Sequence, residues 1–224
     1  MIGILIMTGL IAGCWKVSKN LQKELKEEME TIGEAEKSDR IVVLDAGHGG
    51  TDSGKVGING VKEKDINLTI TNSVKKILEK ENIQVIMTRE TDEQLAQSKV
   101  EDLKYRVSLM NEKKPSLAVS IHQNSYHEEN VFGAQVFYYK TSTEGEKAAA
   151  VIQEALQEVN PENTKKIKAN DTYYLLKKTE VPTVIVECGF LSNYAEAEKL
   201  VSEDYQKKLA EAVTKGILQY LKDQ

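Results

Sequence analysis

Apolar residues from Ile41 onward fall into short runs separated by helical stripes. The run Ile41–Leu44 is continuous and ends in Asp-Ala-Gly, as expected of a strand that is buried on both faces. A helix should follow, and Asp65 is a suitable cap for it. Its apolar stripe consists of Ile66, Ile70, Val74, Ile77 and Leu78. The run Ile83–Met87 then predicts a second strand, which completes a βαβ unit.

The rest of the chain repeats this alternation. Further helices are expected near Glu101–Glu112, at Glu144–Val159 and at Tyr205–Leu221, and strands at Leu117–Ile121, Ala134–Tyr139, Tyr173–Leu176 and Thr183–Val186. This order predicts an α/β fold, with a mostly parallel twisted sheet of about six strands and helices on both faces, in a single domain. The segment Gly133–Tyr139 could pair antiparallel.

The N-terminus has a different pattern. The 14 residues Ile2–Trp15 are almost wholly apolar, and as a helix they would span about 21 Å, less than the roughly 30 Å core of a membrane. We therefore expect residues 1–15 to act as an export signal or membrane anchor. Ile11–Cys14 also resembles a bacterial lipobox with a lipidated cysteine, although small residues can precede a cysteine by chance. A charged helical tether is expected at 16–39, and the folded domain at 40–224.

Composition limits the classes of partner. With 224 residues, 40% of them apolar, the chain can bury a core without disulfides or structural metals, so a metal site is expected to serve function. The formal net charge of −5 comes without a long basic run, which argues against a nucleic-acid partner. Cys14 and Cys188 lie far apart and predict neither a disulfide framework nor a cysteine-rich zinc site.

Three polar segments follow predicted strands, at the edge where α/β sheets bind ligands. They contain His48, His122 and Glu187. Two histidines with a carboxylate are a common catalytic zinc ligand set, and Glu63 beside the glycine-rich loop could supply that carboxylate. Because Glu187 follows an apolar strand, its pKa is expected to be raised toward that of a general base. Structural histidines and a carboxylate at a helix start would give the same residues, so spacing alone leaves the zinc site open.

The order of these segments resembles the zinc N-acetylmuramoyl-L-alanine amidases called amidase type 3, from about Ile41 to Leu221. The matching segments are LDAGHGGTDSG from Leu44, GVKEKD from Gly60, VSIHQN from Val119 and VECGFLSN from Val186. The resemblance implies that His48, Glu63 and His122 bind one catalytic Zn²⁺. It also implies that Glu187 is the catalytic carboxylate, which activates a water molecule to hydrolyse the amide bond between N-acetylmuramic acid and L-alanine in peptidoglycan. Gln123, where a small residue is more usual, and Cys188 depart from the family pattern.

The size of the chain and its segment Gly133–Tyr139 look like those of the germination-specific amidases of spore-forming bacteria. Such enzymes remove stem peptides from spore-cortex peptidoglycan during sporulation, as a step toward muramic-δ-lactam. The chain shows no wall-binding module or inhibitory helix, since only Thr141–Glu146 separates a predicted strand from the next helix. We therefore expect an exported enzyme that could use a protein partner for targeting or activation. A general cell-wall amidase of vegetative growth or division is the alternative.

Other classes of protein fit the sequence less well. Gly49–Lys55 matches the first seven positions of a P-loop, but Val56 replaces the required Ser or Thr. Cys188 could act as a nucleophile with a histidine, although a lone cysteine is more often a small buried residue. A non-catalytic wall-binding protein of the same fold is expected to have lost a zinc ligand or Glu187.

The remaining polar residues of these segments have plainer interpretations. His127 is expected at the surface. Arg89 and Arg106 are expected to anchor structure rather than to bind peptide carboxylates, and Asn124 and Asn193 could hydrogen-bond either to loops or to substrate.

Overall fold

The computed structural model describes residues 18–20, 22–23 and 40–224. Residues 18–20 and 22–23 are helical, and residues 40–224 lie within one compact unit. The predicted export segment with Cys14, and most of the predicted tether, lie outside the described residues. No helix within the described part of the chain is both long enough and apolar enough to cross a membrane.

A six-stranded sheet runs through the unit in the order β2-β1-β3-β6-β4-β5. Its strands are β1 (Ile41–Ala46), β2 (Gln84–Met87), β3 (Leu117–Asn124), β4 (Gln135–Tyr139), β5 (Lys168–Asn170) and β6 (Thr183–Phe190). Every neighbouring pair is parallel except β4 and β6, which are antiparallel. The predicted mostly parallel sheet is therefore confirmed, as is the antiparallel pairing of the segment that contains β4.

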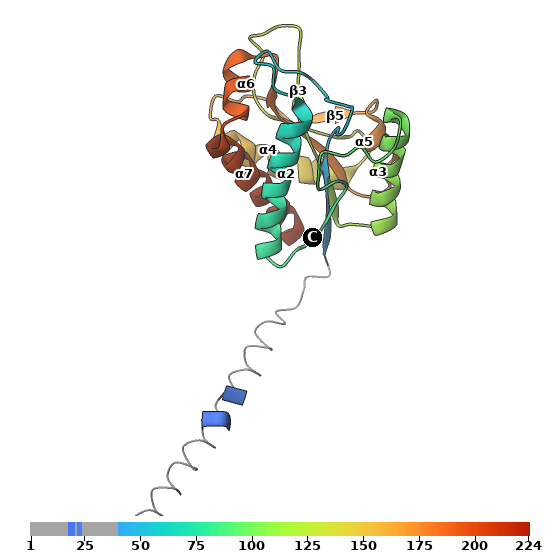
Figure 1. The fold of residues 1–224 in the computed structure, drawn as a ribbon, viewed down its shortest axis with the longest axis vertical. Coiled ribbons are helices and arrows are strands. Elements are labelled where there is room, and N and C mark those ends of the chain that lie inside the picture. Colours follow the sequence, from blue (N-terminus) through green and yellow to red (C-terminus); the bar gives the residue numbers. More distant parts are fainter. Residues whose placement is uncertain (1–17, 21, 24–39) are drawn as a thin grey trace, which may run out of the picture. The chain divides into compact units, whose positions relative to one another are not determined.

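Helices cover both faces of this sheet (Figure 1). One face carries α2 (Glu63–Lys80), α4 (Thr143–Val159) and α7 (Glu203–Lys222), and the other carries α3 (Lys99–Lys113) and α5 (Tyr174–Lys178). A short helix, α6 (Tyr194–Leu200), follows β6. Successive strand residues point to opposite faces, so Val42 and Leu44 pack under the first group of helices and Val43 packs under the second. Strands covered in this way are apolar at every position, which explains the continuous run at Ile41–Leu44.

The expected strand at Tyr173–Leu176 was wrong. Those residues lead into the helix α5, and the edge strand lies earlier, at β5. Leu175 and Leu176 are buried in the same cluster as Phe137 and Ile185, so their apolar character reflects packing of a helix against the sheet. A three-residue strand with two exposed positions carries no apolar run that could identify it.

The expected cap at Asp65 was also wrong. The helix α2 begins at Glu63, and its cap residue Lys62 makes no side-chain cap hydrogen bond. Asp65 instead lies in the first helical turn, where a negative charge interacts favourably with the helix dipole. This earlier start places Glu63, rather than Asp65, at the end of α2 that meets the sheet.

Candidate metal centre

His48, Glu63 and His122 meet at the carboxyl ends of the central strands. His48 follows β1, His122 lies near the end of β3 and Glu63 is the first residue of α2. One possible ligand atom from each of the three lies within 4.8 Å of the other two. His48 Nε2 and His122 Nδ1 approach the same oxygen, Oε1 of Glu63, at 3.2 and 2.9 Å. The structure therefore brings together the three residues that the sequence suggested as ligands.

This donor set suits a zinc ion. A tetrahedral zinc site with bonds of about 2.1 Å separates its ligand atoms by about 3.4 Å, close to the two distances from Glu63. The two imidazole rings are nearly perpendicular, with centroids 4.9 Å apart. Two imidazoles and one carboxylate also leave a coordination position for water or substrate.

Two glycines make this convergence possible. A Cβ atom at Gly47 would lie 2.2 Å from Cε1 and Nε2 of His122, so any other residue there would displace the ring. A Cβ atom at Gly54 would lie 2.5 Å from Oε2 of Glu63, and Gly54 also has a positive φ of 63°. The glycine-rich loop is therefore built to let backbone pass directly beside two of the three ligands.

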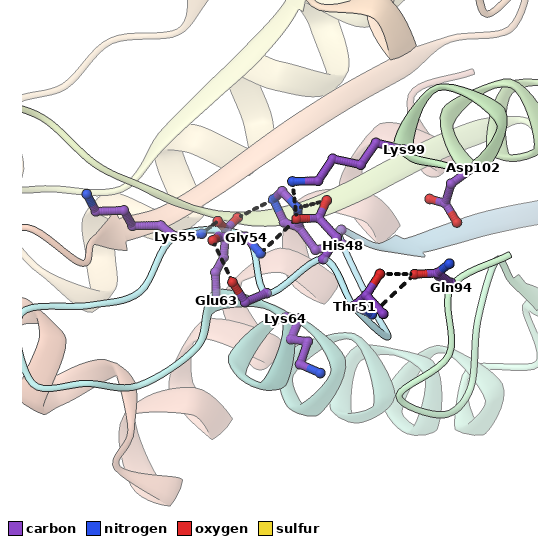
Figure 2. Close-up of polar contacts among 12 residues, drawn as sticks. His48, Thr51, Gly54, Lys55, Glu63, Lys64, Gln94, Lys99 and Asp102 are labelled. Atoms are coloured by element: carbon purple, nitrogen blue, oxygen red, sulfur yellow. Dashed lines mark hydrogen bonds and ion pairs between the residues drawn. The ribbon is translucent and has the colours of Figure 1, made fainter. Parts of the chain in front are cut away.

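Asp52 and Lys99 orient His48 from outside the centre. His48 Nδ1 lies 2.9 Å from Oδ2 of Asp52, which leaves Nε2 directed at Glu63. Lys99 reaches from α3 toward this loop and pairs with Oδ1 of Asp52 at 2.7 Å (Figure 2). Burial would raise the pKa of Asp52, but the hydrogen bonds from Lys99 and His48 outweigh it and lower the pKa to about 2. Neither residue was expected at the site from the sequence, although a carboxylate four positions after His48 was an available signal.

Glu63 is held on both of its oxygens. Oε2 accepts a hydrogen bond from the backbone N–H of Lys55 at 2.8 Å, and Oε1 accepts one from the N–H of Gln123 at 3.1 Å. Burial would raise the pKa of Glu63, but hydrogen bonds with His122 and His48 outweigh it and lower the pKa well below its usual value. For His122, burial would lower the pKa, but the hydrogen bond to Glu63 raises it to about 9. The carboxylate is therefore ionised, as a metal ligand must be.

Glu187 stands beside these ligands. It lies on β6 in register with His122 on β3, so the two side chains share one face of the sheet. It is buried, and among the described residues its Oε2 has no hydrogen-bond partner. Burial raises the pKa of Glu187 to about 7, against the opposing effect of the positive charge on His122. The sequence-based expectation of a raised pKa at Glu187 is thus in line with the structure.

Two buried arginines fix the backbone that carries His48. Arg106 donates to the backbone oxygens of Ala46 and His48, both at 2.8 Å. Arg89 donates to the oxygens of Ala46 and Gly47 at 2.8 and 3.1 Å. Both guanidinium groups are thus occupied by the protein itself, which confirms the expectation that they anchor structure.

Comparison with known proteins places this chain among enzymes. The family profile described as N-acetylmuramoyl-L-alanine amidase matches residues 42–219. The chain belongs to this amidase family. The match covers all three candidate ligands and Glu187, and it makes the protein an amidase of peptidoglycan.

Individual relatives of this amidase are similar over most of their length. The germination-specific N-acetylmuramoyl-L-alanine amidase of Bacillus subtilis (strain 168) is 40% identical over 191 residues, which cover 82% of this chain and 80% of the relative. The structure of the CwlD amidase from Clostridioides difficile, in complex with the GerS lipoprotein, matches with a TM-score of 0.80 and 37% identity over 83% of this chain and 100% of that one. The catalytic domain of CwlV from Bacillus (Paenibacillus) polymyxa var. colistinus matches with a TM-score of 0.74 and 31% identity, over 83% and 99% of the two chains.

A cavity of about 480 Å³ opens over the amidase centre. Its floor contains the three candidate ligands and Glu187, and its walls come from the starts of α3 and α5 and from the end of β3. The residues that line these walls include Lys55, Lys99, Leu103, Asn124, Ser125, Tyr173 and Tyr174. The cavity is therefore large enough to admit a substrate group to the carboxyl edge of the sheet.

The other candidate residues lie outside this chemistry. Cys188 is buried, and burial raises the pKa of its thiol, which disfavours the thiolate that a cysteine hydrolase needs. His127 is exposed at the surface, as expected. Asn193 caps α6 and donates to the backbone oxygen of Glu129, so it fastens loops, whereas Asn124 lines the cavity. The helix after the glycine-rich loop starts only at Glu63, well beyond Lys55, which rules out a P-loop.

Proposed function

We propose that this amidase hydrolyses the bond between N-acetylmuramic acid and L-alanine in spore-cortex peptidoglycan, with one zinc ion bound by His48, Glu63 and His122 and with Glu187 as general base. One observation carries the proposal: the buried Glu187, whose Oε2 has no partner among the described residues, stands in register with His122, a candidate ligand in a two-histidine, one-carboxylate set. A buried polar atom without a partner is unfavourable unless a ligand satisfies it, and water or substrate in this cavity would do so.

The chain's own residues supply the proton transfers. A bound zinc ion would polarise the lactyl carbonyl and lower the pKa of a water molecule. Glu187 accepts a proton from the attacking water, because its pKa of about 7 keeps it available as a base near neutral pH. The same carboxyl then protonates the leaving L-alanine nitrogen, which releases the stem peptide. Asp52 meanwhile holds His48 with Nε2 directed inward.

The relatives support the spore cortex as the place of action. A germination-specific amidase is 40% identical to this chain, and the CwlD amidase shares its fold at a TM-score of 0.80. Removal of stem peptides would leave muramic acid residues free for conversion to muramic-δ-lactam during sporulation. Such an enzyme acts outside the cytoplasmic membrane, so we propose export through residues 1–15, with a cleaved signal, an anchor or a lipidated Cys14 as the forms it could take. The complex of CwlD with a lipoprotein supports a protein partner for targeting or activation here also.

Product analysis with metal exchange tests this function. The purified full-length chain is stripped with a chelator, reloaded with zinc and incubated with peptidoglycan from spore cortex and from vegetative walls. We expect mass spectrometry to find released stem peptides with a free N-terminal L-alanine. More should be released from spore cortex than from vegetative walls, and release should require zinc. Glu187→Gln is the matched control and should bind zinc but release nothing. Preferential release from vegetative walls would favour a general wall amidase, and zinc-independent release would contradict the proposed centre.

A further inference from the structure

Tyr173 lies in the wall of the amidase cavity, and none of the roles above uses it. It directly precedes α5 and lines the cavity together with His122 and Glu187. Its ring packs against Phe137 of β4, with centroids 5.4 Å apart. Phe137 is paired with Ile185 on β6, and Glu187 follows two positions later on the same face of that strand, roughly 7 Å farther along. The ring therefore lies on the stretch of sheet that leads to Glu187.

The backbone of Tyr173 is fixed by hydrogen bonds, whereas its hydroxyl has no partner among the described residues. Oδ1 of Asn170 accepts hydrogen bonds from the N–H groups of Thr172 and Tyr173, at 2.8 and 2.7 Å. The backbone oxygen of Tyr173 accepts from Lys177 at 3.0 Å, in the first turn of α5. Within the described part of the chain, the phenolic oxygen of Tyr173 makes no hydrogen bond. A donor that stands on a fixed backbone, and that the described residues leave unused, is available to a bound substrate.

The surroundings keep this hydroxyl protonated. Burial raises the pKa of Tyr173, and the negative charges of Glu187 and Glu63 raise it further. The two carboxylates that raise this pKa lie on β6 and at the start of α2, the two elements that flank the reaction centre. Near neutral pH the hydroxyl is therefore protonated and can donate a hydrogen bond.

We infer that Tyr173 is a further catalytic residue, whose hydroxyl donates a hydrogen bond to the carbonyl oxygen of the scissile amide as that oxygen gains negative charge. The inference rests on the proposed amide hydrolysis, in which attack of water converts a neutral carbonyl oxygen into an oxyanion. Fixed donors aimed at such an oxygen are among the largest contributions to catalysis. Two cationic side chains along the cavity are already engaged, since Lys99 pairs with Asp52 and Arg106 is bonded to carboxylates and backbone.

Tyr173→Phe removes only the hydroxyl, and Tyr105→Phe, at an exposed position on α3, is its matched control. Both are made in the full-length, zinc-loaded chain and assayed on a soluble muramyl peptide whose L-alanine is amide-linked to the lactyl group. We expect Tyr173→Phe to lower kcat on the order of 10²-fold with little change in KM, because the hydrogen bond strengthens only in the transition state. Tyr105→Phe should retain its kcat, and both variants should keep the zinc content and melting temperature of the wild type.

A binding measurement separates this role from a structural one. A phosphinate analogue, with a tetrahedral anionic group in place of the scissile amide, is titrated calorimetrically into wild type and variants. Tyr173→Phe should weaken its binding by a factor similar to the loss in kcat, whereas binding of the uncleaved muramyl peptide, measured in the Glu187→Gln background, should not change. Wild-type kcat in Tyr173→Phe, or an equal loss in Tyr105→Phe, would overturn the inference while leaving the proposed function intact. Absence of hydrolysis by the wild-type enzyme would overturn both.

Discussion

Two buried clusters of charge lie on the same side of the sheet, and they differ in how completely they are satisfied. In the structural cluster of Asp45, Asp102 and Arg106, every nitrogen of the guanidinium group donates a hydrogen bond. Both oxygens of Asp45 accept bonds, from Arg106 and Thr88 on one and from Ser120 on the other. In the candidate metal centre, two imidazoles, of His48 and His122, compete for one oxygen of Glu63. Beside it, Oε2 of Glu187 has no partner among the residues that the structure describes.

This difference indicates that the first cluster stabilises the fold and that the second is arranged to bind a ligand. A fully satisfied buried cluster holds the backbone in place and has no remaining capacity for a ligand. An incompletely satisfied one is unfavourable in the free protein and becomes favourable when a cation and substrate complete it. Altering the structural cluster should therefore destabilise the fold, whereas altering the metal centre should remove activity and can stabilise the metal-free protein.

The largest expected loss of stability follows removal of Arg106. Arg106→Met leaves Asp45 and Asp102 buried without their main partner, and breaking a buried ion pair in this way costs about 3–5 kcal/mol of unfolding free energy. Urea denaturation of wild type and variant measures it. The double variant Arg106→Met, Asp45→Asn should lose less than the sum of the single losses, because the two residues interact. A loss below about 1 kcal/mol would show that the cluster is not structural.

In the metal-free protein, Glu187→Gln should raise the free energy of unfolding rather than lower it. The pKa of Glu187 is raised from 4.5 to about 7, so its stabilising protonated form is fully present below pH 4.5 and is lost as pH rises through 7. The neutral amide avoids that loss, and the variant should be more stable than wild type by about 3 kcal/mol above pH 7. At pH 4 the two proteins should unfold alike. Thermal unfolding in the presence of a chelator, at pH 4 and pH 8, makes the comparison, and a less stable variant at pH 8 would contradict it.

Acid should weaken the structural cluster over a defined pH range. Burial would raise the pKa of Asp45, but Arg106, Ser120 and Thr88 outweigh it and lower the pKa from 3.8 to about 2. Stability from this carboxylate is therefore complete above pH 3.8 and is lost as pH falls through 2, by about 2 kcal/mol. Urea titrations between pH 5 and pH 2 should show this loss in wild type. Asp45→Asn should lack this part of the loss of unfolding free energy. A loss of the same size in the variant would refute the assignment to Asp45.

The smallest effect is expected at the rim, where Lys99 pairs with Asp52. The lysine side chain is 73% exposed, and such pairs contribute less than about 1 kcal/mol. Lys99→Met should therefore change the free energy of unfolding only slightly, with the difference vanishing in high salt because exposed charges are screened. Lys104→Met, which removes another exposed pair on α3, is the matched control. A loss as large as that of Arg106→Met would mean that the loop carrying His48 depends on Lys99.

Much of the fold and the centre could be predicted from local sequence. Continuous apolar runs identify the central strands because those strands are buried on both faces, and polar residues directly after them fall at the ligand-binding edge. The local pattern therefore predicts that His48, His122 and Glu187 lie at the same edge of the sheet. The amidase family could also be recognised, because four short segments occur in the right order.

Tertiary structure decided what depends on distances between segments. Tyr173 was expected in a strand, since apolar periodicity over a few residues cannot distinguish a strand from one turn of a buried helix. Loop geometry brings Asp52 into contact with His48. Strand register and loop geometry also leave the hydroxyl of Tyr173 and Oε2 of Glu187 without a partner among the residues described. The sequence determines which residues are buried and which chemistry they carry, because burial follows local pattern. Which buried groups are left unsatisfied is set only when distant segments pack together.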